Sequence, residues 1–145
     1  MNSFNHYAYG AVGDWMYRVV AGLNDDPSQP GYRHIVVRPE PGGGLTHATA
    51  ALLTPYGEAA SGWALEGDTL RVTARVPANT RATVHLPGAR LEQVREGGAG
   101  LGSAPGVTRA VQSGDTVLVE VGSGHYEFAY QAPALAARLR GGARR

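Results

Sequence analysis

The chain has 145 residues, which suits one domain of ordinary size. Its 13 basic and 12 acidic residues leave a formal net charge of +1, so no overall field attracts nucleic acid or an anionic membrane. There is no cysteine, which excludes disulfides and thiolate metal sites, and no apolar run near the roughly 20 residues of a membrane span. No signal peptide is recognisable, so we expect a soluble chain whose compartment, cytoplasmic or exported, stays open.

Residues 3–23 are predicted to form a helix, because apolar residues recur at the 3.6-residue period. The stripe consists of Val12, Trp15, Met16, Val19, Val20 and Leu23. Ser3 suits the N-cap and Gly22 lies close to the expected C-cap. Burying such side chains stabilises a fold by about 1.5–3 kcal/mol each. The stripe must therefore pack on the rest of this chain or on a helical body outside it, and Gly10 and Gly13 favour the second because glycines allow close backbone approach.

After a linker turn at residues 24–31, the period changes to 2, which is typical of strands. The predicted strands are 34–39, 46–55, 58–67, 69–77, 81–88, 106–114, 116–124 and 126–131. With no helix between them, they indicate a mainly β fold: an antiparallel β-sandwich over residues 32–131, preceded by one N-terminal α-helix. The glycine-rich segment 96–106 is predicted to be a flexible hairpin loop, and the basic residues 132–145 a disordered tail.

The richest polar cluster is Asn5, His6 and Tyr7 in the first predicted helical turn. It suits a polar helix start, and it equally suits a sugar site. Sugar hydroxyls need planar donors and acceptors, and an aromatic ring packs against the C–H groups of the sugar. These three residues are therefore the candidate substrate-binding residues.

Other chemistry finds little support in the sequence. The remaining histidines stand on different predicted strands without metal-ligand spacing, so we predict no metal site and no cofactor. The segments 41–45 and 97–102 lack the strand-to-helix setting of nucleotide loops, and no nucleophile elbow is present. The acidic residues mostly lie beside glycines or at outward strand positions, where their pKa values stay low. We therefore predict no catalytic residue in this chain.

Three motifs, in this order, carry a family resemblance: SFNHYAYG at 3–10, PGYRHIVVRP at 30–39, and TPYG at 54–57 with Ser61 and Trp63 after it. They resemble the C-terminal end of bacterial α-L-rhamnosidases of glycoside hydrolase family 78. The resemblance implies that residues 1–23 end an (α/α)₆ barrel and that a C-terminal β-sandwich follows. It also implies that His6 lies near the sugar, with Asn5 and Tyr7 as neighbours of less secure role.

Members of this family hydrolyse terminal α-L-rhamnose from glycosides with inversion, using one carboxylic acid and one carboxylate. By the resemblance, both groups come from barrel segments upstream of the first motif. We therefore expect a C-terminal fragment that is inactive alone. We expect it to dock on an upstream barrel domain or to self-associate through the helix stripe.

A second reading is an independent, non-catalytic carbohydrate-binding or structural sandwich. Binding sandwiches expose aromatic platforms, whereas the aromatics here are dispersed, which disfavours this reading; they are Tyr56, Trp63, Tyr126 and Phe128. A third reading, a complete hydrolase with an unrecognised site, is disfavoured by the missing carboxylate pair.

Overall fold

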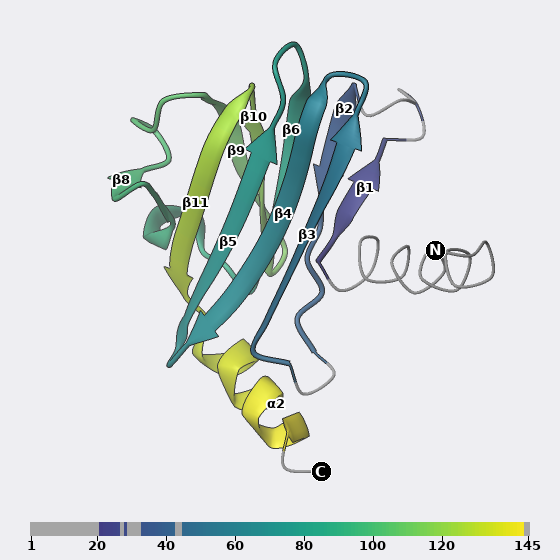
Figure 1. Cartoon of the computed structure of the whole chain (residues 1–145). Helices are drawn as coiled ribbons and strands as arrows, with labels where there is room; N and C mark the ends of the chain where they lie inside the picture. Colours follow the sequence, from purple (N-terminus) through teal and green to yellow (C-terminus); the bar gives the residue numbers. More distant parts are fainter. Residues whose placement is uncertain (1–20, 27, 29–32, 43–44, 144–145) are drawn as a thin grey trace, which may run out of the picture.

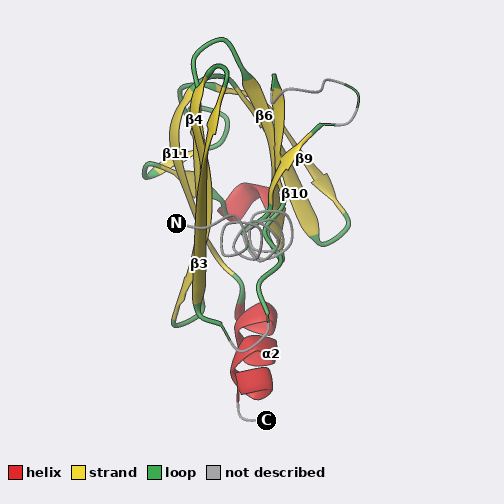
Figure 2. Ribbon diagram, turned by 45° about the vertical axis from the view of Figure 1, so that its right-hand side comes forward, coloured by secondary structure: helices red, strands yellow, loops and turns green. Residues whose placement is uncertain are grey.

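The computed structural model describes residues 21–26, 28, 33–42 and 45–143. Two β-sheets face each other as layers, and one helix, α2 (Pro133–Ala143), extends below them (Figures 1 and 2). The predicted β-sandwich is confirmed. The predicted helix over 3–23 lies outside the described residues except for its last three. Of these, Leu23 begins a strand instead, because Gly22 has a left-handed φ of 79° and redirects the backbone there.

The first sheet has the order β1-β2-β6-β10-β9. Its strands are β1 (Leu23–Asp25), β2 (His34–Val37), β6 (Arg81–Pro87), β10 (Thr116–Val121) and β9 (Val107–Ser113). The pairs are antiparallel except β2 and β6, which run parallel. The predicted antiparallel arrangement therefore has one exception.

The second sheet has the order β3-β4-β5-β11-β7-β8. Its strands are β3 (His47–Thr54), β4 (Gly57–Glu66), β5 (Thr69–Val76), β11 (Gly124–Gln131), β7 (Arg95–Glu96) and β8 (Ala99–Gly100), and a 3₁₀ turn, η2 (Leu91–Gln93), precedes β7. Every pair in this sheet is antiparallel. The strands predicted from the two-residue period match strands of the two sheets.

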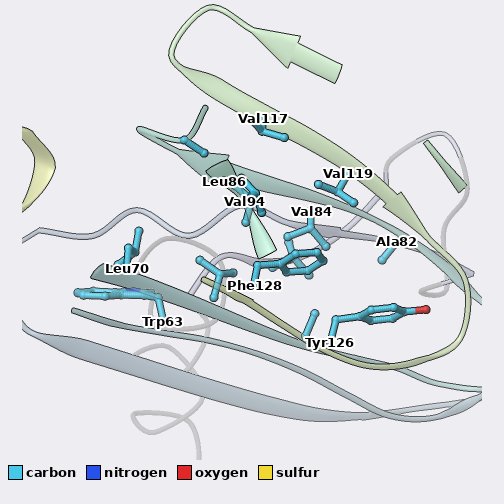
Figure 3. Close-up of a cluster of buried hydrophobic side chains, with 14 of the residues drawn as sticks. Trp63, Leu70, Ala82, Val84, Leu86, Val94, Val117, Val119, Tyr126 and Phe128 are labelled. Atoms are coloured by element: carbon cyan, nitrogen blue, oxygen red, sulfur yellow. The ribbon is translucent and has the colours of Figure 1, made fainter. Parts of the chain in front are cut away.

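The core lies between the sheets, where inward residues alternate with outward ones. In β5 the inward set is Leu70, Val72, Ala74 and Val76, and in β10 it is Val117, Val119 and Val121. Trp63 and Phe128 are the largest fully buried side chains, and Figure 3 shows them among these aliphatic groups. Phe128 stacks on Tyr126 with ring centroids 6.1 Å apart.

The linker turn predicted at 24–31 is wrong for its first two residues, because Leu23–Asp25 form β1. Two further sequence predictions also differ from the structure. The segment 96–106 is not only a loop, because β7 and β8 pair as a short hairpin around Gly97 and Gly98. Both glycines have positive φ (56° and 89°), as a tight two-residue hairpin turn requires. The glycines thus make the turn of the hairpin.

The basic segment 132–145 was predicted to be disordered, yet most of it forms α2. Pro133 suits the first helical position, because its missing N–H has no partner there in any helix. Leu135, Ala136 and Leu139 then fall on one face and are buried against the core. No helix within the described ranges has both the length and the hydropathy to cross a membrane.

Candidate functional site

The three predicted substrate-binding residues, Asn5, His6 and Tyr7, lie outside the described residues. The part of the structure that bears on them is the segment through which they join the sandwich. We call this segment, residues 21–26, the junction. Its geometry decides how firmly the sandwich holds the chain that precedes it.

The start of the junction, residues 21–23, is buried although it lies at the edge of the sandwich. Ala21 is fully buried, and Leu23 is 1% exposed and joins the hydrophobic core. The Oγ of Ser61, on β4 of the opposite sheet, donates a hydrogen bond to the carbonyl oxygen of Ala21. The junction therefore contacts both layers.

Gly22 lies directly on the backbone of the residues after β2. A Cβ at this position would overlap the carbonyl group of Arg38 and the nitrogen of Pro39. The backbone N–H of Arg38 donates to the carbonyl oxygen of Gly22 at 2.7 Å. A side chain would remove this close approach, so the position requires glycine.

Beyond Gly22, β1 pairs with β2, and the ladder continues with a hydrogen bond of 3.1 Å from the Asp26 N–H to the His34 carbonyl. The carboxylate of Asp26 lies 2.7 Å from Nδ1 of His34, and Nε2 of His34 lies 2.9 Å from Oγ1 of Thr83 on β6. Ser28 donates to the same carboxylate from its N–H at 2.9 Å and its hydroxyl at 2.8 Å. These bonds fasten the end of the junction to β2 and β6.

A carboxylate, an imidazole and a hydroxyl in a row also occur in acyl-transfer triads. Hydrogen bonds from the backbone and side chain of Ser28, and then from His34, lower the pKa of Asp26, so the carboxylate stays charged as the fixed centre of a turn. The pocket beside Thr83 has a volume of about 180 Å³. Ligand sites usually occupy about 300–1,000 Å³. The cluster thus fits a structural role, holding the end of the junction in place, better than a reaction site.

Two larger depressions lie elsewhere on the sandwich. One, of about 570 Å³, lies between η2, the β7–β8 hairpin and β9, and the other, of about 490 Å³, lies at the start of α2. Neither has an aromatic side chain in its lining, which a sugar site would use to cover the face of the ring. They are weak candidates for a saccharide site.

Six carboxylates on the outside of the described structure pair with arginines. The pairs are Arg71 with Glu66 (3.1 Å) and Glu127 (2.9 Å), Arg75 with Glu58 (2.6 Å), Arg140 with Asp68 (2.9 Å), Arg90 with Asp115 (3.4 Å) and Arg109 with Glu120 (3.7 Å). These six carboxylates are thus engaged in ion pairs at the surface. Among the residues the structure covers, no group of three or more His, Asp or Glu side chains could hold a metal ion.

Comparison with known proteins connects this fold to one family. The sequence model of the bacterial alpha-L-rhamnosidase C-terminal domain matches residues 22–100. An alpha-L-rhamnosidase of Formosa agariphila is 49% identical over 87 residues, which are 60% of this chain and 9% of the relative. An alpha-L-rhamnosidase of Streptomyces avermitilis is 39% identical over 128 residues, which are 88% of this chain and 12% of the relative.

Solved structures similar to this chain belong to the same family as the sequence matches. The crystal structure of Streptomyces avermitilis alpha-L-rhamnosidase complexed with L-rhamnose matches with a TM-score of 0.70 and 37% identity, covering 90% of this chain and 12% of that one. The alpha-L-rhamnosidase from Dictyoglumus thermophilum matches with a TM-score of 0.72 and 32% identity, covering 90% and 14%. The chain thus spans about a tenth of the length of these curated relatives.

Proposed function

Because the chain belongs to the family of bacterial α-L-rhamnosidase C-terminal domains, we propose that it serves as the C-terminal part of an α-L-rhamnosidase. The observation that carries this proposal is the match of 39% identity over 88% of the chain to the Streptomyces avermitilis enzyme. The reaction is hydrolysis of terminal α-L-rhamnose from glycosides with inversion. This chain supplies the sandwich and the segment before it, and the catalytic barrel lies in an upstream part.

In this proposal the two carboxylic groups that inversion requires, about 6.5–9.5 Å apart, belong to the upstream part. His6 contributes a ring nitrogen to the hydroxyls of the bound sugar, and Asn5 and Tyr7 support it with an amide and a phenol. Six of the described carboxylates are engaged in ion pairs with arginines, which fits an acid and a base supplied elsewhere. The chain alone is then expected to be inactive.

The alternative is an independent, non-catalytic carbohydrate-binding or structural module. Of the described aromatic side chains, Trp63, Phe128, Tyr126 and Tyr130 are at most 6% exposed, and only Tyr56 is exposed, at 40%. A single tyrosine makes no platform for a sugar chain. The buried aromatics therefore favour the rhamnosidase proposal.

The test is the hydrolysis of a chromogenic aryl α-L-rhamnoside, measured over a range of pH. The purified chain alone should give no turnover. A chimera in which this chain replaces the matching region of the Streptomyces avermitilis enzyme should be active. Turnover by the chain alone that survives repurification would overturn the proposal, because it would require a carboxylate pair within these 145 residues.

His6→Ala in the chimera should lower kcat/KM about tenfold or more, as expected for losing a hydrogen bond made to the sugar. The matched control is His125→Ala, since His125 is exposed on β11, and it should leave kcat/KM unchanged. Equal activity of the His6 and His125 variants would remove His6 from the site.

A further inference from the structure

Three buried polar side chains occur in the described part of the chain: Thr54, Ser61 and Thr80. Thr54 donates to the carbonyl of Gly57 at 2.7 Å and Thr80 to that of Pro77 at 2.6 Å, so each closes its own turn. Ser61 differs, because its hydroxyl bonds a residue 40 positions earlier in the chain. This bond links two segments that local structure alone would not join.

Packing does not explain why residue 61 is a serine. Ser61 is an inward residue of β4, between Ala59 and Trp63 on the same face. A buried hydroxyl costs free energy unless it is hydrogen-bonded, whereas an alanine side chain needs no such partner. The carbonyl of Ala21 is the partner that makes the serine favourable.

Together with a second hydrogen bond, this bond holds two successive peptide groups, those of Ala21 and Gly22, and we call the pair of bonds the clamp. The carbonyl of Ala21 is held by Ser61 from the second sheet, and the carbonyl of Gly22 is held by the N–H of Arg38, which follows β2 of the first sheet. The edge strands of the two sheets, β1 and β3, lie on the same side of the sandwich (Figure 1). Two consecutive carbonyls fixed from two layers set both the position and the direction of the backbone at this point.

We propose that Ser61 is a positioning residue that, together with Gly22, fixes the position and direction of the backbone at Ala21, to which the segment bearing His6 is joined along the chain. This inference rests on the function proposed above. Ser61 touches no substrate in this scheme, and it acts by holding the carbonyl of Ala21. The role of the sandwich in the reaction is thus to hold the backbone to which the proposed sugar-binding segment is joined.

Amide hydrogen exchange on the chain alone tests the clamp. Ser61→Ala should speed exchange of the Arg38 amide, which bonds Gly22, by about tenfold, while the amides of the β5–β11 ladder keep their rates. Thr80→Val, which removes a buried hydroxyl that closes its own turn, should leave Arg38 unaffected. Unchanged exchange at Arg38 in Ser61→Ala, or an equal acceleration of every amide, would overturn the proposal.

A double-mutant cycle in the chimera tests the consequence for the reaction. Ser61→Ala should lower kcat/KM in the parent chimera but have little further effect when His6 is already alanine, because Ser61 acts through that segment. Additive losses would mean that Ser61 serves the fold in general, which would overturn the positioning role. The exchange experiment needs no activity, so it decides the clamp whether or not the rhamnosidase proposal holds.

Discussion

The two ends of the described chain, the junction and α2, are attached to the sandwich with a different balance of hydrogen bonding and apolar packing. At the junction, backbone carbonyls accept hydrogen bonds from Ser61 and Arg38, and Gly22 lies against another backbone. At the other end, Leu135 and Leu139 of α2 pack on the core. An exposed ion pair between Arg140 and Asp68 (2.9 Å) accompanies that packing.

The difference indicates at which end the path of the backbone is fixed more strictly. Hydrogen bonds to successive carbonyls allow one backbone path, whereas apolar side chains on a helix tolerate repacking with similar volumes. An exposed ion pair adds only about 0–1 kcal/mol. The junction therefore suits an attachment that must keep one geometry, and α2 suits a cover for the end of the core.

The largest effect is expected from Gly22→Ala. The left-handed φ costs a non-glycine residue about 1–2 kcal/mol, and the overlap with the Arg38 carbonyl requires a backbone shift of similar cost, so unfolding by urea should show a loss of about 3 kcal/mol. Gly114→Ala is the matched control, since Gly114 has φ 60° and nothing within 4 Å of a Cβ. It should cost only about 1 kcal/mol. Equal losses in the two variants would contradict the close approach at the junction.

A smaller effect is expected from Leu139→Ala in α2. Leu139 is 7% exposed, and large-to-small changes at buried positions cost about 2–5 kcal/mol. The lower end, about 2 kcal/mol, is expected because a helix at the end of the described chain can detach while the sheets persist. Loss of helical circular dichroism ahead of the main urea transition would show this local detachment. Arg138→Ala, at an exposed position of the same helix, should change stability by less than about 0.5 kcal/mol.

The comparison also shows what the sequence could predict. The longer strands were predictable because most of them carry the two-residue alternation that one buried face imposes, as in β5 and β10. The short strands β1, β7 and β8 were not predicted. The tail prediction was wrong because its arginines and glycines suggested a solvated segment. The short apolar face of Leu135, Ala136 and Leu139 becomes meaningful only beside the core that it covers.

The junction was harder to predict, because its parts are far apart in sequence. The alternation of β4 places residue 61 inward, so a hydroxyl there signals a buried polar group that needs a partner. Nothing local identifies Ala21 as that partner, because the contact depends on how two sheets meet. Gly22 has a left-handed φ, which glycine allows, but its contact with the backbone of Arg38 is tertiary and has no local signal in the sequence. The sugar-site residues Asn5, His6 and Tyr7 stay predictions.

The smallest effect is a pH dependence on the junction side of the molecule. Burial, and then the nearby charge of Arg38, lower the pKa of His85 on β6 below 6.5. As pH falls through 6.5 the unfolded chain takes up a proton that the folded chain resists, so stability is lost until the lower folded pKa is passed. From pH 7.5 to 5.5 the urea midpoint of the wild type should therefore fall, and that of His85→Gln should fall less.

The control is His125→Gln, which is at an exposed position and should keep the pH dependence of the wild type. If the urea midpoints of the wild type and His85→Gln fell by the same amount, protonation of His85 would have no effect on stability, which would contradict the prediction.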